Sequence, residues 1–179
     1  GAPAVPVSVV TGQGLEELKE TLDRLLEETP RKPDLGRPRL AVDRSFTMSG
    51  FGTVVTGTLL EGSLVVGQEV ELTPSRQRAR VRGLQSHRLR MEVADPGRRL
   101  AVNLSGISHD DIQRGEVLTA PGKLVPTRMA SVYLRVVGWA PQSVKHNLVV
   151  TFHTGTSETN ARIRLLDAME LKPGQEGWA

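Results

Sequence analysis

Residues 43–58 read DRSFTMSGFGTVVTGT, and the pattern within this stretch predicts a β-hairpin. Gly50 and Gly52 carry no Cβ, so the chain can reverse direction there at positive φ. Residues 53–56 are threonine and valine, whose β-branched side chains favour an extended strand. Gly57 lies inside that strand and indicates a bulge or a close approach of another backbone.

The sequence on both sides of the hairpin continues as β-structure. Residues 40–46 are expected to form a strand in which Leu40, Val42, Arg44 and Phe46 alternate with Ala41, Asp43 and Ser45. Further strands are expected at 53–60, 68–73, 78–85, 99–105, 116–119, 129–138, 147–154 and 160–166. Glycines within and between these segments supply turns, and many short antiparallel strands predict a closed barrel or a sandwich. The chain is therefore expected to be mainly β.

Two segments rich in proline and glycine predict the domain boundaries. Residues 29–38 hold three prolines and one glycine, which excludes a helix or a central strand and indicates a linker at residues 30–38. The segment PGKLVP at residues 121–126 divides the β-region into a complete small barrel over residues 39–122 and a second barrel over residues 123–179. The second barrel is expected to be incomplete, because so few strands leave open edges and little core.

A short strand–helix unit precedes the linker over residues 1–29. Residues 5–10 (VPVSVV) predict a buried strand, and leucines then recur at three- and four-residue steps, which defines the apolar face of a helix. These leucines are Leu15, Leu18, Leu22, Leu25 and Leu26. A lone strand and helix in front of the linker, and an incomplete barrel behind it, indicate a segment of a longer protein.

Composition limits the classes of function. Apolar residues make up 38% of the chain and charged residues 24%, within the globular range. No apolar run approaches the roughly 20 residues of a membrane-spanning helix, so no membrane partner is expected. The chain has no cysteine, which excludes disulfides, thiolate metal sites and cysteine nucleophiles. At 3%, aromatic residues are too few for a platform that grips single-stranded nucleic acid by stacking.

Neither a catalytic constellation nor a metal site is predicted. The neighbours Asp110 and Asp111 are typical of a helix cap or a solvated pair, and no serine has the context of a nucleophile. The histidines show no metal-ligand spacing with other ligands; they are His87, His109, His146 and His153.

Positive charge concentrates in the β-region. The net charge is +3, and six arginines lie between residues 76 and 90 with no acidic residue among them. A strand would place Arg76, Arg78, Arg80 and Arg82 on one face. That face is either simply solvated or directed at RNA phosphates, and binding of the second kind weakens steeply with salt.

The hairpin and four later segments, in the same order, resemble the second domain of translational GTPases of the elongation factor Tu superfamily. The later segments are VVGQEV at 65–70, VRGLQ at 81–85, PGRRLAVNL at 96–104 and IQRGEVL at 112–118. The resemblance implies an elongation-factor-Tu-like β-barrel here and the end of an α/β GTPase domain in front of it. The segment VSVVTGQGL at residues 7–15 is similar to the last guanine-recognition element of that domain. The resemblance implies that Ser8 and Val9 would contact the guanine base of the nucleotide.

Within that superfamily the chain resembles the bacterial selenocysteine-specific elongation factors. The supporting segments are VDRSF at 42–46, VRGLQSH at 81–87 and HTGTSETNARIRLL at 153–166. The resemblance implies that Asp43, Arg44 and Arg99 form the pocket for the aminoacyl end of selenocysteinyl-tRNA. Two unpaired buried guanidinium groups would bind the anionic selenolate and reject the neutral seryl group. Asp43 would receive the α-amino group or orient an arginine.

Residue geometry leaves other readings open. Asp43 and Arg44 are adjacent, so in a regular strand they face opposite sides of the sheet, and both reach one pocket only where the strand bends. Arg99 has the alternative of pairing with a surface carboxylate. Two functional alternatives also stay open: another member of the superfamily that binds ordinary aminoacyl-tRNA, and a stand-alone ligand-binding β-barrel.

The resemblance also implies what the whole protein binds. The family's phosphate-binding loop and switch elements do not occur in this sequence, so this chain is not expected to be an enzyme or to hold a cofactor. The whole protein is expected to be a GTPase that binds GTP and Mg²⁺. Its expected partners are selenocysteinyl-tRNA, the ribosome and, through domains beyond residue 179, the selenocysteine-insertion hairpin of messenger RNA. Its expected location is the cytoplasm.

Overall fold

The computed structural model describes residues 2–30 and 34–179. The chain forms two compact units, one that ends before residue 34 and one that spans residues 34–179. The first unit holds an α-helix, and the second holds all of the described strands.

The N-terminal unit contains α1, Leu15–Glu28, which confirms the helix that the leucine spacing predicts. Gly14 begins the helix at φ 75°, and the Thr29 hydroxyl ends it by donating to the Leu25 carbonyl at 2.6 Å. The leucine face is not covered by this unit, since Leu22 is 49% exposed. No helix among the described residues combines the length and the apolar composition needed to cross a membrane.

The strand predicted over residues 5–10 is wrong. Described residues before α1 form turns but no strand, and the side chains of Val9 and Val10 are almost fully exposed. A strand needs a neighbour to satisfy its N–H and C=O groups, and the described part of this unit contains no second strand. The segment instead closes a turn, in which the Ser8 N–H donates to the Gln13 carbonyl at 3.0 Å.

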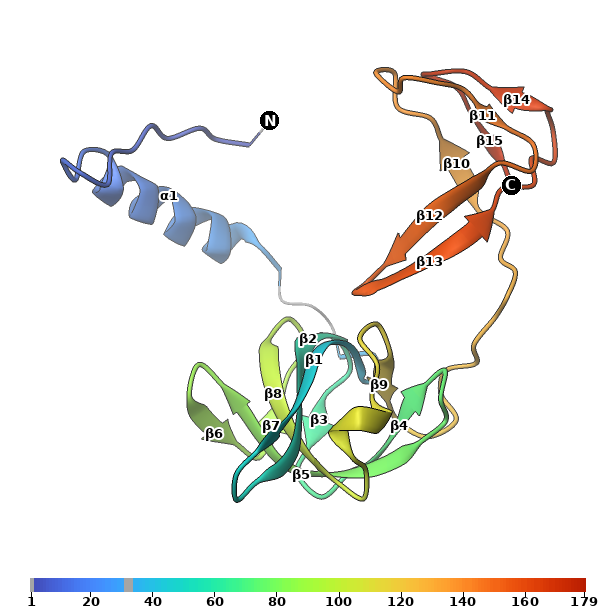
Figure 1. The fold of residues 1–179 in the computed structure, drawn as a ribbon. Coiled ribbons are helices and arrows are strands. Elements are labelled where there is room, and N and C mark those ends of the chain that lie inside the picture. Colours follow the sequence, from blue (N-terminus) through green and yellow to red (C-terminus); the bar gives the residue numbers. More distant parts are fainter. Residues whose placement is uncertain (1, 31–33) are drawn as a thin grey trace. The chain divides into compact units, whose positions relative to one another are not determined.

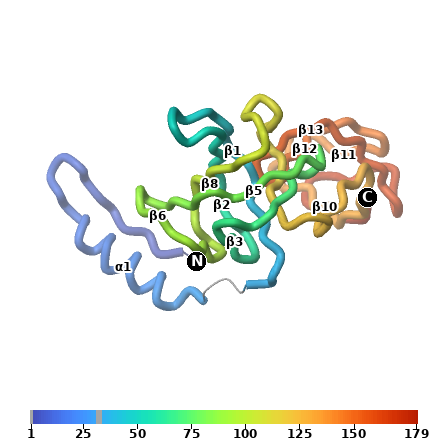
Figure 2. Tube along the Cα trace, turned by 90° about the horizontal axis from the view of Figure 1, so that it is seen from below, coloured from blue at the N-terminus to red at the C-terminus, as the bar shows by residue number. Residues whose placement is uncertain are grey.

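Six strands of the second unit close into a barrel (Figure 1, Figure 2). Their order is β4-β9-β1-β2-β8-β5, and pairing of β4 with β5 completes the ring. The strands are β1 (Arg39–Met48), β2 (Gly52–Glu61), β4 (Glu69–Thr73), β5 (Arg78–Ser86), β8 (Arg99–Ser105) and β9 (Val117–Thr119). Smaller elements are β3 (Leu64–Val65), β6 (Leu89–Met91), β7 (Val93–Ala94) and the 3₁₀ turn η1 (His109–Asp111). The closed barrel confirms the predicted fold class.

Aliphatic side chains fill the interior of the barrel. Along β8, Leu100, Val102 and Leu104 are buried, whereas the alternate residues are exposed (Arg99) or half-buried (Ala101, Asn103 and Ser105), which is the period of two expected of a strand. The same core cluster includes Leu40, Val42, Val55, Leu59, Leu72, Leu84 and Leu118. Inward residues therefore build the fold, and the outward residues of the same strands are free for function.

The C-terminal part of this unit consists of three two-stranded sheets. The pairs are β10 (Tyr133–Arg135) with β15 (Glu176–Trp178), β11 (Val144–Lys145) with β14 (Glu170–Leu171), and β12 (Val149–Thr154) with β13 (Ser157–Arg162). Its own small core contains Val136, Leu165 and Leu171. The long strands predicted at 129–138 and 160–166 are shorter or shifted, because each pairs along only part of its length.

The β1–β2 hairpin has the glycine geometry that its sequence predicts. Gly50 and Gly52 have φ values of 79° and 82°, in the region that favours glycine. Gly57 serves a different purpose, because a Cβ at that position would collide with the Ala41 carbonyl oxygen and the Leu40 side chain. The close approach of β1 to β2 therefore requires glycine at this position.

Replacement of Gly57 by alanine tests that close approach. We expect the free energy of unfolding to fall by about 2 kcal/mol or more, because the new Cβ must push β1 and β2 apart. Gly83→Ala is the matched control, since Gly83 lies in β5 and a Cβ there meets only the Asn103 Cβ, at 4.0 Å. Its unfolding free energy is expected to change by about 0.5 kcal/mol or less. Urea denaturation compares the two variants, and equal losses would contradict the close approach.

Candidate functional site

A one-residue bulge in β1 controls which side chains reach the outer face of the barrel. Val42 is paired with Gly57 and Arg44 with Thr56, so Asp43 is an extra residue without its own partner on β2. Val42 is buried in the core of the barrel. Thr56 of β2 pairs with Ala101 of β8, and both of these residues lie on the outer face of the barrel. Because of the bulge, Arg44 returns to the outer face directly after Asp43 instead of pointing inward.

The bulge brings Asp43 beside Arg99, which lies on β8 beyond the intervening strand β2. The Arg99 guanidinium donates through Nη1 to the Asp43 carboxylate at Oδ2. Arg99 pairs with Thr58 of β2, so its side chain projects from the same outer surface. Asp43, Arg99 and the exposed Arg44 thus share one face of the barrel. In a regular strand the neighbours Asp43 and Arg44 would face opposite sides of the sheet, and the bulge is the reason that they do not.

The same arrangement corrects the expected state of the two arginines. They are neither buried nor both unpaired: the Arg99 side chain is 57% exposed and bonded to Asp43, and Arg44 is exposed. No hydrogen bond or ion pair of the Arg44 side chain is present among the described residues. The three groups together carry one net positive charge. They attract an anion, but they do not reject a neutral group by stranding buried charge.

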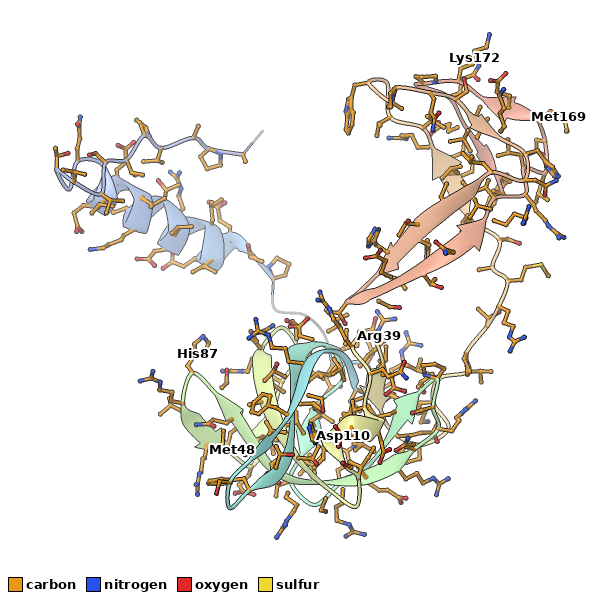
Figure 3. All side chains as sticks on the ribbon, viewed as in Figure 1. Arg39, Met48, His87, Asp110, Met169 and Lys172 are labelled. Carbon is orange, nitrogen blue, oxygen red and sulfur yellow. The ribbon has the colours of Figure 1, made fainter. Side chains whose placement is uncertain are left out.

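A groove of about 610 Å³ lies on the outer side of the strands that carry these residues. Its apolar lining includes Phe46, Met48, Phe51, Val54 and Met91, and its polar lining includes Arg82, Gln85, Arg90 and Asn103. The Arg90 guanidinium lies 5.7 Å from the centroid of the Phe51 ring. In Figure 3, Met48 marks the β1–β2 hairpin and His87 marks the turn between β5 and β6.

Sequence reasoning missed this groove. Aromatic residues are rare in the chain, but two of its three phenylalanines, Phe46 and Phe51, line the same groove. The Asn103 amide donates to the Phe51 carbonyl at 2.6 Å and so holds the hairpin turn against β8. Strict alternation along residues 40–46 would put Phe46 on the same inner face as Val42. Only the bulge moves Phe46 to the outer face, and the sequence pattern does not reveal the bulge.

The arginine stripe is only partly available to a ligand. Arg78, Arg80 and Arg82 alternate outward along β5 as expected, but Arg76 precedes the strand and has φ 65°. Arg76 donates to the buried Glu71 carboxylate at 2.8 Å, and Arg78 lies 3.4 Å from the Glu69 carboxylate. The charges of Arg76 and Arg78 are therefore compensated by these carboxylates, whereas Arg80 and Arg82 form no ion pair with the described residues.

The candidate nucleotide-binding residues Ser8 and Val9 lie in the turn before α1. The Ser8 carbonyl accepts the Gly12 N–H at 2.9 Å, and its hydroxyl accepts the Thr11 N–H at 3.3 Å. The Val9 side chain is 86% exposed. The turn is therefore held by its own hydrogen bonds.

Comparisons with known proteins agree with this architecture. Residues 52–119 match the family described as elongation factor Tu domain 2. The chain is 46% identical over 177 residues to the selenocysteine-specific elongation factor of Desulfomicrobium baculatum, an alignment that covers 98% of this chain and 28% of that protein. It is 30% identical over 183 residues to elongation factor 1-alpha of Pyrobaculum aerophilum, covering 96% of this chain and 41% of that protein.

A solved structure extends the similarity to three dimensions. The crystal structure of the bacterial selenocysteine-specific elongation factor EF-Sec matches with a TM-score of 0.74 and 26% identity, over 95% of this chain and 28% of that chain. The chain thus spans 28% to 41% of the length of these three proteins. Residues 52–119 are thus an elongation factor Tu domain 2, and nearly the whole chain is similar in sequence and in fold to selenocysteine-specific elongation factors.

Proposed function

We propose that the outer face of this barrel holds the aminoacyl end of selenocysteinyl-tRNA within a translation elongation factor. The observation that carries the proposal is the bulge, which places Asp43 and Arg44 on the same face as Arg99. The whole protein would deliver this tRNA to the ribosome with GTP and Mg²⁺ bound to its GTPase domain, to which Ser8 and Val9 would belong. We assign its location to the cytoplasm.

The charge of the cargo supplies the chemical basis for selection. A selenol is more acidic than a thiol, so the cargo presents a selenolate near neutral pH, whereas a seryl group stays neutral. Arg44 and Arg99 would donate charge-assisted hydrogen bonds to the selenolate. Asp43 already orients Arg99, and it would also accept a hydrogen bond from the α-ammonium group of the cargo.

The adjoining groove suits the nucleotide that carries the amino acid. Phe46 and Phe51 offer rings on which a base of the RNA can stack. Arg90 beside Phe51 adds a cation that can bind an RNA phosphate or pack against the ring of a base. Arg82 on the same groove adds positive charge next to the backbone of the RNA. The messenger RNA hairpin would be bound by other parts of the whole protein.

Charge selection is tested by Arg99→Ala in the whole protein, with Arg98→Ala as the matched control. Arg98 is the exposed neighbour and carries the same charge, but the described structure gives it no bond to Asp43. We expect Arg99→Ala to weaken binding of selenocysteinyl-tRNA about 10-fold, as expected for loss of a hydrogen bond to a charged group, with little change for seryl-tRNA. Filter binding or fluorescence titration measures both affinities.

Equal losses for the two cargoes would refute charge selection. That outcome would favour a factor for ordinary aminoacyl-tRNA, a reading that the similarity to elongation factor 1-alpha also makes worth testing. Equal effects of Arg98→Ala and Arg99→Ala would show that only general positive charge matters.

The salt dependence of tRNA binding distinguishes free from compensated arginines. We expect Arg80→Ala and Arg82→Ala each to reduce the slope of log affinity against log salt by roughly 0.7 to 0.9, because each removes one phosphate contact. Arg76→Ala should leave the slope unchanged, since Arg76 is held by Glu71, and should instead lower the melting temperature. Slopes that are unchanged in the first two variants would show that the stripe is only a solvated face.

A further inference from the structure

The tip of the β12–β13 hairpin contacts β1 at the residue before the bulge. The tip carries the motif HTGT at residues 153–156, and β12 and β13 are drawn as a long hairpin in Figure 1. The Thr156 hydroxyl donates to the Val42 carbonyl at 2.7 Å, across 114 positions of sequence.

The Val42 carbonyl matters because it belongs to the peptide group that leads into Asp43. The carbonyl of Val42 and the N–H of Asp43 lie in one rigid plane, so fixing the carbonyl fixes the direction in which the chain enters Asp43. The same carbonyl also accepts the Gly115 N–H at 3.0 Å, and the Val42 N–H donates to the Glu116 carbonyl at 2.8 Å. The peptide plane is therefore held from two sides, by the loop before β9 and by the hairpin tip.

The loop before β9 is itself rigidly built. The Glu116 side chain is buried, and its carboxylate accepts the N–H groups of Ser75 at 3.2 Å and Gln113 at 3.1 Å. Gly115 has φ 93°, and a Cβ there would lie 2.7 Å from the Ser157 Cα. The hairpin tip thus fits against a fixed loop at a glycine that leaves room for it.

We propose that Thr156 is a positioning residue for the Asp43–Arg99 pair. Its hydroxyl fixes the Val42–Asp43 peptide, this peptide directs the Asp43 carboxylate, and the carboxylate holds the Arg99 guanidinium on the outer face. The hairpin of the C-terminal part is in this way a component of the anion site on the barrel. The consequence for cargo selection rests on the proposed function, whereas the effect on Asp43 and Arg99 does not.

Nuclear magnetic resonance on the ¹⁵N-labelled chain tests the positioning directly. Thr156→Val removes the donor and keeps the β-branched shape, and we expect it to shift the Asp43 amide signal and the Arg99 Nε–Hε signal. Thr156→Ser keeps the donor and should restore both signals. Thr154→Val is the matched control, because Thr154 lies in the same hairpin, is exposed and makes no hydrogen bond through its side chain among the described residues.

The inference is overturned if Thr156→Val and Thr154→Val give the same Asp43 and Arg99 signals, or if Thr156→Ser behaves like Thr156→Val. Thr156→Ala removes the same donor with less bulk, so it repeats the test if the valine variant does not fold.

Cargo binding by the whole protein provides the second readout. Thr156→Val is expected to reduce the preference for selenocysteinyl-tRNA over seryl-tRNA roughly 2- to 10-fold, the range that corresponds to one neutral hydrogen bond. If the wild-type protein prefers selenocysteinyl-tRNA and Thr156→Val keeps the same preference, the role of Thr156 in cargo selection is overturned. A wild-type protein without any preference would overturn the proposed function, and the resonance signals would still decide whether Thr156 positions Asp43.

Discussion

The extra residue at Asp43 determines which side chains of β1 face the groove. In a strand with strict alternation, the core residue Val42 and the polar residue Arg44 would share the inner face, and a guanidinium would enter an aliphatic core. The bulge removes that conflict by adding one residue between them. It also lets the carboxylate of Asp43 reach Arg99 across β2. One irregularity of the backbone thus preserves the core and assembles the charged site.

Compensation of charge divides the arginines into structural and available groups. Arg76 closes a turn by pairing with the buried Glu71, so its charge serves the fold. Arg80 and Arg82 on β5 have no such partner among the described residues and face outward, and Arg82 lines the groove. A count of arginines along the sequence treats these residues alike. Their acidic partners come from another strand, and the register between β4 and β5 decides which arginine is neutralised.

Local pattern predicts what depends on neighbours in the sequence, and it fails where partners are remote. The glycines at positions 50 and 52, the helix over Leu15–Glu28 and the alternation along β8 all follow from nearby residues. The segment at residues 5–10 has strand-like composition, but it forms no strand because ladder bonds need a partner segment. The bulge, the Phe46–Phe51 groove and the Thr156 contact depend on long-range register, which composition and periodicity do not encode.

The exposure of the charged site limits how strongly it can discriminate by itself. Two unit charges about 4 Å apart interact by about 1 kcal/mol in bulk water and by about 4 kcal/mol at an effective dielectric constant of 20. Arg99 is 57% exposed, so water screens its attraction for an anion toward the lower of these limits. Strong selection by charge therefore requires that the bound RNA end, or another part of the whole protein, exclude water from this face. In the proposed function, the barrel would therefore supply the geometry and the sign of the charge that recognise the cargo, and exclusion of water over the bound cargo would supply most of the binding strength.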